Sequence, residues 1–357
     1  MTVTGGFPAP GSQDRDPARL GSYAGPPPSG PPVQPPGPMQ QIPILTAHKP
    51  GIVPLRPLQL GDILDGAVKA VRFNPKPMVG LSAVVLAVFL VPSAALGIGA
   101  THLAARVLST LGPDAGAFLG LSSSVIQAVS TELATALLSG VLIYVVGQAV
   151  LGRKPDIGAT WRSTRGRLPS LLALAMLSGL FSLLATMLLI GPGVLLLINN
   201  DLGTGLLVLF VGLLSLIAVA LAVSTKISMA APAIVLEGHG ILAGLRRSFM
   251  LTKGAAFWRI LGITLLAGLL AGIVGSLLGL PFSIVGTAIA TLSTQDSESA
   301  QMIVTFISHL SALLTGAITT PFVAAVTGLL YIDRRMRLEA LDVVLFRESQ
   351  SNPAPPI

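Results

Sequence analysis

Polar side chains within otherwise apolar stretches are the residues of this sequence best suited to chemistry. Glu132 and His309 stand in two such stretches, and Ser311, Thr315 and Thr319 repeat every four residues. Ionisable groups at membrane depth usually serve a function, because burying their charge is costly. These residues form a candidate intramembrane polar site, in which Glu132 binds a cation or proton and His309 is a protonatable group beside Thr315. The alternatives are a Glu132 at the headgroup end of its helix and a hydroxyl stripe that packs against a neighbouring helix.

The motifs that organise common catalytic sites are absent from the sequence. There is no cysteine, which excludes thiolate catalysis and cysteine-ligated metals. The four histidines form no metal-ligand pair, and neither a nucleophile elbow nor a phosphate-binding loop occurs. Ser308 adjoins His309, but adjacent side chains point about 100° apart on a helix. We therefore predict a protein that is not an enzyme and that holds no metal or cofactor.

The composition indicates which solvent surrounds these residues. Of 357 residues, 52% are hydrophobic and only 10% are charged, whereas soluble domains carry roughly 25% charged residues. A helix needs about 20 apolar residues to cross a bilayer. The sequence therefore predicts an all-α integral membrane protein with six transmembrane helices, at Met78–Ala100, Val125–Val150, Leu171–Leu197, Gly205–Ala230, Ile260–Phe282 and Met302–Ile332.

The distribution of basic residues predicts the orientation of these helices. All but one of the 22 Lys and Arg residues fall on one side of the six stretches, and the exception is Arg106. By the positive-inside rule we expect a multi-pass plasma (inner) membrane protein with both termini in the cytoplasm. The net charge of +7 does not indicate nucleic-acid binding, because no basic stretch is interleaved with aromatic residues.

The two ends of the chain differ in composition from the apolar region. Residues 1–50 are rich in proline and glycine and offer little apolar surface to bury, so we predict a disordered cytoplasmic tail. Two PxxP spacings between Pro28 and Pro35 suggest either a docking site for a protein partner or a simple spacer. We assign residues 51–346 to the six-span membrane domain and residues 347–357 to a disordered C-terminal tail.

An amphipathic segment precedes each odd-numbered span, at residues 60–72, 156–169 and 240–249. This pattern predicts three cytoplasmic interfacial helices and a pseudo-threefold repeat, with ordinary positive-inside connectors as the alternative. Basic residues near a membrane surface attract anionic headgroups. We expect the lipid or partner contacts at six of them: Lys69, Arg72, Arg162, Arg165, Arg246 and Arg247.

Two sequence signatures carry a family resemblance. The run LRPLQLGDILDGA at Leu55–Ala67 resembles the N-terminal segment of a bacterial six-span family that is abundant in actinobacteria and usually described as proline- and glycine-rich membrane proteins. The segment 232–238, leading into 245–249 and 257–259, is similar to its second signature. The likeness extends to the membrane domain ahead of the catalytic barrel in some glycerophosphodiester phosphodiesterases, but we expect no such barrel in this protein. The resemblance implies a membrane fold and no catalytic residues.

Together these observations support two hypotheses about function. The first is a non-enzymatic plasma-membrane protein that engages anionic lipid or partner proteins through its basic cytoplasmic rim. The second is a transporter or lipid translocator with a polar lining around the sixth span. They differ in where the protein should be sensitive to substitution: at the basic rim or at membrane depth.

Overall fold

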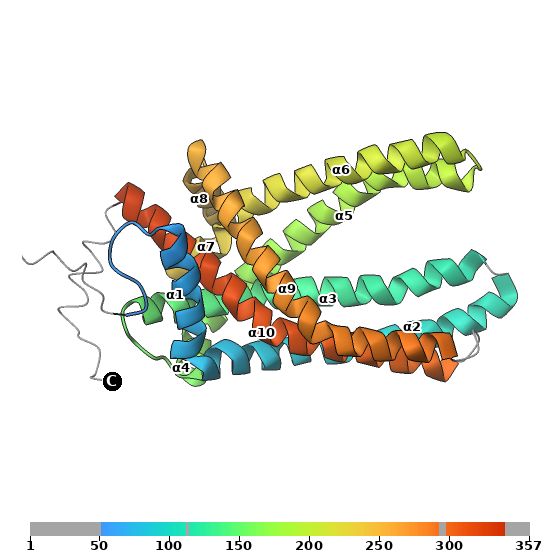
Figure 1. The fold of residues 1–357 in the computed structure, drawn as a ribbon, viewed down its shortest axis with the longest axis horizontal. Coiled ribbons are helices and arrows are strands. Elements are labelled where there is room, and N and C mark those ends of the chain that lie inside the picture. The colour runs from blue at the N-terminus through green and yellow to red at the C-terminus, as the bar shows by residue number, and fades with distance from the viewer. Residues whose placement is uncertain (1–50, 112–113, 293–297, 340–357) are drawn as a thin grey trace, which may run out of the picture. The chain divides into compact units, whose positions relative to one another are not determined.

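Apolar helices joined by short turns make up the chain, since a helix satisfies its own backbone hydrogen bonds inside a bilayer. The computed structural model describes residues 51–111, 114–292 and 298–339 (Figure 1). The predicted tails at 1–50 and 347–357 lie outside these residues. The elements are α1 (Leu60–Phe73), η1 (Lys76–Gly80), α2 (Leu81–Leu111), α3 (Asp114–Val150), α4 (Ile157–Thr164), η2 (Arg165–Arg167), α5 (Leu168–Ile198), α6 (Leu202–Ile227), α7 (Ala230–Leu236), α8 (Ile241–Leu251), α9 (Ala255–Leu292) and α10 (Glu298–Glu339).

The predicted fold class is confirmed over the described residues. They contain no strand, and six stretches are long and apolar enough to cross a membrane. The helices α2, α3, α5, α6, α9 and α10 coincide with the six predicted spans. The protein is therefore an all-α, multi-pass membrane protein.

The core of the bundle lies where α10 packs between α2, α3 and α9. Leu86 on α2, Leu142 on α3 and Tyr331 on α10 are fully buried there. Small residues permit the close approach of these helices. A Cβ built on Gly316 of α10 would lie 2.9 Å from a methyl carbon of Leu86, so a larger residue would require the Leu86 side chain to move.

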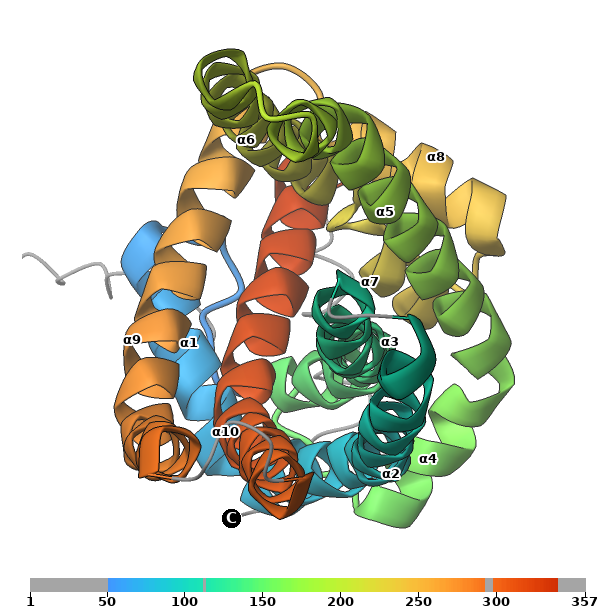
Figure 2. The same cartoon turned by 90° about the vertical axis from the view of Figure 1, so that its right-hand side faces the viewer.

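The α5–α6 hairpin is packed very differently from the core. Its two helices contact each other so closely that a Cβ on Gly212 would overlap the carbonyl oxygen of Leu189. Only 6% of the most apolar window of each helix is buried, against 56% for α3. Away from α4 and α8 the hairpin diverges from α2, α3 and α10, which both views show (Figures 1 and 2). The hairpin therefore exposes much of its apolar surface. It also forms one side of a groove.

The three predicted amphipathic segments contain α1, α4 and α8, each ahead of a span, but the second helix is shorter than predicted: it ends at Thr164, and residues 165–169 belong to η2 and the start of α5. Local sequence explains where they begin. Asp156 caps α4 by accepting a hydrogen bond from the backbone N–H of Ala159 (2.6 Å), and Gln59 and Asp62 form a capping box at α1. We call this side of the bundle, with α1, α4, α8 and the adjoining span ends, the basic end. The pseudo-threefold repeat stays a prediction.

Candidate functional site

A half-open groove of about 680 Å³ lies between α3, α5, α6 and α10. Each helix contributes one stripe of residues spaced three or four apart, as Ser178, Ser182 and Thr186 show on α5. Most lining side chains are apolar or small, and the volume falls in the range of small-molecule sites. The stripes also carry ten hydroxyl groups, on Thr135, Ser139, Ser178, Ser182, Thr186, Ser224, Ser228, Thr319, Thr320 and Thr327. We call this cavity the hydroxyl groove.

The hydroxyl groove runs along the spans rather than across them. On α5 its lining extends from Leu171 to Thr186, which corresponds to about 22 Å of helix. A hydrocarbon core is about 30 Å thick. The groove reaches Ser228 at the basic end and Glu132 at the middle of α3. On α6 the lining begins only at Leu216, so the groove follows the half of the α5–α6 hairpin nearer the basic end.

The polar groups of the groove have a defined chemistry. Thr135, Ser178 and Thr319 donate their protons to backbone carbonyls of their own helices at 2.9 to 3.0 Å. Such back-bonding leaves the hydroxyl oxygen free to accept a further hydrogen bond. Among the described residues that line the groove, Glu132 alone is charged. The lining can thus accept hydrogen bonds along its length and attract a cation or an ammonium group at Glu132.

The structure separates the predicted intramembrane residues. Glu132 is exposed and lines the hydroxyl groove, and so does Thr319. Thr315 lies instead against α9, where a Cβ on Gly275 would be 3.0 Å from its methyl carbon. His309 is 4% exposed and also lies outside the lining. On α10 the groove is lined by Thr319, Thr320 and Thr327 among its polar residues, and not by His309 or Thr315.

His309 takes part in a buried hydrogen-bond chain between α2 and α10. Its Nδ1 lies 2.8 Å from the carbonyl oxygen of Thr305, which can only accept a hydrogen bond. In the neutral ring Nε2 is then an acceptor, and the hydroxyl of Ser93 donates to it at 2.9 Å. Ser93 and His309 are both buried and no groove residue adjoins them in sequence. This pair joins two helices, and no local sequence signal connected residues 216 positions apart.

The predicted basic rim is only partly available to a ligand. Arg72, Arg162, Arg165 and Arg246 are exposed. Lys69 pairs with Asp65 one helical turn away, as their spacing predicts.

Arg247 is the one rim arginine whose side chain lies mostly inside the protein. It forms ion pairs with Glu237 (3.2 Å) and with Glu339. Burial opposes the charged form of Arg247, but the hydrogen bonds to these two carboxylates outweigh it and raise the pKa above its ordinary value. The positive charge of Arg247 is therefore compensated by two carboxylates of the same chain.

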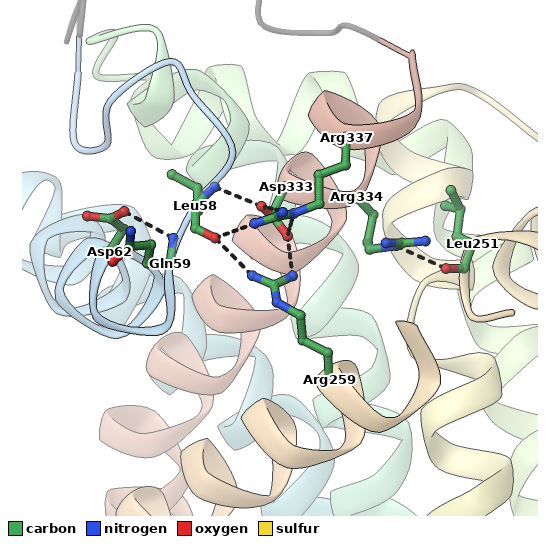
Figure 3. Close-up of polar contacts among 8 residues, drawn as sticks. All are labelled: Leu58, Gln59, Asp62, Leu251, Arg259, Asp333, Arg334 and Arg337. Carbon is green, nitrogen blue, oxygen red and sulfur yellow. Dashed lines mark hydrogen bonds and ion pairs between the residues drawn. The ribbon is translucent and has the colours of Figure 1, made fainter. Parts of the chain in front are cut away.

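A buried ion cluster, which the sequence patterns did not predict, surrounds Asp333 at the basic end (Figure 3). Asp333 accepts a hydrogen bond from the backbone N–H of Leu58 (2.8 Å) and pairs with Arg259 and Arg337. Both guanidinium groups also donate to the carbonyl oxygen of Leu58 at 2.8 Å. Arg334 donates to the carbonyl oxygen of Leu251 at the end of α8 (3.1 Å). These contacts hold two parts of the chain against the end of α10: the segment that precedes α1, and the end of α8.

A signal for this cluster was present in the sequence. Asp333 follows the last apolar stretch and stands among Arg334, Arg335 and Arg337, which marks a carboxylate with basic neighbours. Its partners Leu58 and Arg259 come from the two signatures that carry the family resemblance. Only the tertiary structure brings these three segments together.

No described group of three or more His, Asp or Glu side chains could hold a metal ion. No family model, curated protein or solved structure matches the chain. The resemblance to the actinobacterial six-span family therefore stays a prediction.

Proposed function

We propose that this protein is a non-enzymatic lipid translocator of the bacterial plasma membrane, with the basic end in the cytoplasm. The observation that carries the proposal is the hydroxyl groove, which runs about 22 Å along the spans from the basic end and is half-open. The basic residues at α1, α4 and α8 support the orientation by the positive-inside rule.

A lipid suits the groove better than a small solute does. The groove is half-open between apolar helices that expose large side chains such as Leu188 and Phe210. In a bilayer such an opening fills with lipid chains, because leaving it empty loses dispersion contacts and water is excluded. A headgroup that enters the groove would replace part of its lost hydration by hydrogen bonds to the hydroxyl oxygens. That exchange lowers the cost of moving a polar headgroup across the hydrocarbon.

Glu132 indicates which headgroups the groove favours. Its carboxylate is the charged group of the lining. None of the described lining residues is a Lys or an Arg. A carboxylate attracts ammonium groups and repels phosphates that carry no positive partner. We therefore propose that lipids with an amine in the headgroup move through the groove faster than anionic lipids do.

A leaflet-exchange assay tests the proposal. The purified protein is reconstituted into vesicles that contain traces of phosphatidylethanolamine with a fluorophore on its acyl chain. A membrane-impermeant reductant then bleaches only the outer leaflet. We expect bleaching to proceed beyond half of the signal with the protein and to stop at half without it. Acyl-labelled phosphatidylglycerol should exchange more slowly, and Glu132→Gln should reduce that difference.

Two alanines on α6 offer a matched pair of variants. Ala220 lines the groove, whereas Ala218 is exposed outside it. Ala220→Trp should block exchange because the indole fills the groove, and Ala218→Trp should leave the rate unchanged. Equal rates for the two variants, or no exchange beyond that of protein-free vesicles, would refute the translocator.

A further inference from the structure

We infer that a second cavity, beneath α4, holds one acyl chain of an anionic phospholipid whose phosphate is bound by Arg162 and Arg165. This site shares no lining residue with the hydroxyl groove. It rests on the proposed cytoplasmic orientation of the basic end but not on lipid translocation. A lipid bound at this site would be a stable component of the protein and not a transported substrate.

The cavity beneath α4, which we call the α4 slot, has a volume of about 370 Å³. Every side chain that lines it is apolar, including Val84 on α2, Leu137 on α3, Trp161 on α4 and Leu168 on α5. The indole N–H of Trp161 is the one side-chain hydrogen-bond donor among these lining residues, so the slot suits a hydrocarbon chain better than water or a polar solute. It is also half-open, which gives a chain from the bilayer a way in.

Contacts with the bundle hold α4, which carries Arg162 and lines the slot with Ile157 and Trp161. Thr160 and Thr164 are fully buried, and Ser163 donates a hydrogen bond to the hydroxyl of Tyr144 on α3 (3.2 Å). Thr160, Ser163 and Thr164 share one face of α4, and their contacts hold the helix against the bundle. The opposite face is exposed and contains Trp161 and Arg162.

The spacing of residues along this face connects the charge to the cavity. Ile157 and Trp161 line the slot one helical turn apart, Arg165 follows Trp161 by four residues, and Leu168 again lines the slot. Arg165 starts the 3₁₀ turn η2 and stands in the chain between Trp161 and Leu168, two residues that line the slot. Arg162 is exposed beside Trp161.

The chemistry of this rim matches a phosphate at the membrane surface. Guanidinium groups bind phosphate oxygens in a bidentate manner. Trp161 is 44% exposed while it lines the slot, as expected of an indole at the level of the headgroups. Lys154 is also exposed, and its Nζ lies 4.5 Å from the ring centroid of Phe73.

Trp161 provides a direct reporter of the slot. The chain has two tryptophans, so Trp258→Phe leaves Trp161 as the sole indole. This variant is reconstituted into vesicles that contain increasing fractions of phospholipid with brominated acyl chains, which quench a tryptophan in contact with them. We expect brominated phosphatidylglycerol to quench Trp161 at a lower mole fraction than brominated phosphatidylcholine.

Charge-neutralising variants in the same background test the role of the rim. Each arginine at the surface contributes about a fivefold preference for anionic lipid, so Arg162→Gln with Arg165→Gln should lower that preference about thirtyfold. Arg246→Gln removes an exposed arginine from α8 and should leave the preference intact. Equal quenching by the two lipids before substitution would overturn the inference. So would a preference that survives the double variant.

Filling the slot tests the acyl chain separately. Val84 lines the slot, whereas Val91 is an exposed valine of α2 that does not. Val84→Phe should weaken quenching by both brominated lipids, and Val91→Phe should not. If both variants quench as the parent does, no chain occupies the slot. Leaflet exchange can fail in the assay above while the phosphatidylglycerol preference persists, which would refute the translocator and retain this site.

Discussion

The ion cluster around Asp333 makes the strongest prediction about stability. Asp333 is completely buried and compensates Arg259 and Arg337, which are 31% and 37% exposed. Asp333→Asn keeps the shape of the side chain and an acceptor for the N–H of Leu58, but it removes the negative charge. Breaking a fully buried ion pair costs roughly 3–5 kcal/mol. Because water still reaches part of both arginines, we expect the free energy of unfolding to fall by about 3 kcal/mol, at the lower limit of that range.

Two measurements check this value. Equilibrium unfolding in mixed micelles, with sodium dodecyl sulfate as denaturant and tryptophan fluorescence as the signal, gives the change in the free energy of unfolding. Hydrogen exchange followed by mass spectrometry reports on residues 52–63. We expect faster exchange there, since the cluster fastens Leu58 to α10.

Asp65→Asn is the matched control. Asp65 pairs with Lys69 on the surface of α1, with 61% of its side chain exposed. Exposed pairs of this spacing contribute about 0.5 kcal/mol or less. If Asp333→Asn destabilises the protein no more than Asp65→Asn does, the cluster does not hold the basic end together and the reasoning is wrong.

Three further predictions concern packing, the groove and topology. Gly212→Ala should lower stability by about 1–3 kcal/mol, because a Cβ would meet a backbone oxygen of α5, whereas Gly203→Ala enters open space and should be neutral in the same unfolding assay. His309→Ala should lower stability through the loss of a buried hydrogen bond, by roughly 1–3 kcal/mol. It should leave leaflet exchange per folded molecule unchanged, because His309 lies outside the groove; a loss of exchange at full stability would contradict this placement. A cysteine at Ser163 should react with an impermeant maleimide only in lysed cells and one at Asn199 in intact cells, and the reverse pattern would invert the proposed topology.

The helices and their order followed from local properties of the chain. Apolar runs longer than a bilayer is thick predicted the six spans, and the structure confirms them. The capping residue Asp156 and the amphipathic pattern predicted α4 in the same way. Such features depend on neighbouring residues, so a single sequence is enough to find them.

The groove was harder to predict for a physical reason. Its hydroxyl stripe on α5, at Ser178, Ser182 and Thr186, has the same four-residue spacing as the stripe at Ser311, Thr315 and Thr319. Periodicity identifies residues that share a helix face but does not say what the face meets. One stripe faces the groove, whereas Thr315 packs against glycine residues of α9.

By itself, the sequence determined the all-α membrane class, the six spans and the amphipathic helices between them, because these depend on hydrophobicity and periodicity along one segment. Only the tertiary structure decided that Asp333 joins Leu58 to Arg259, that Ser93 is the partner of His309, and that Glu132 stands in a groove. These contacts join residues from different helices. They depend on which helix faces pack together, and pairs of helices with similar apolar surfaces offer many arrangements that local sequence does not distinguish.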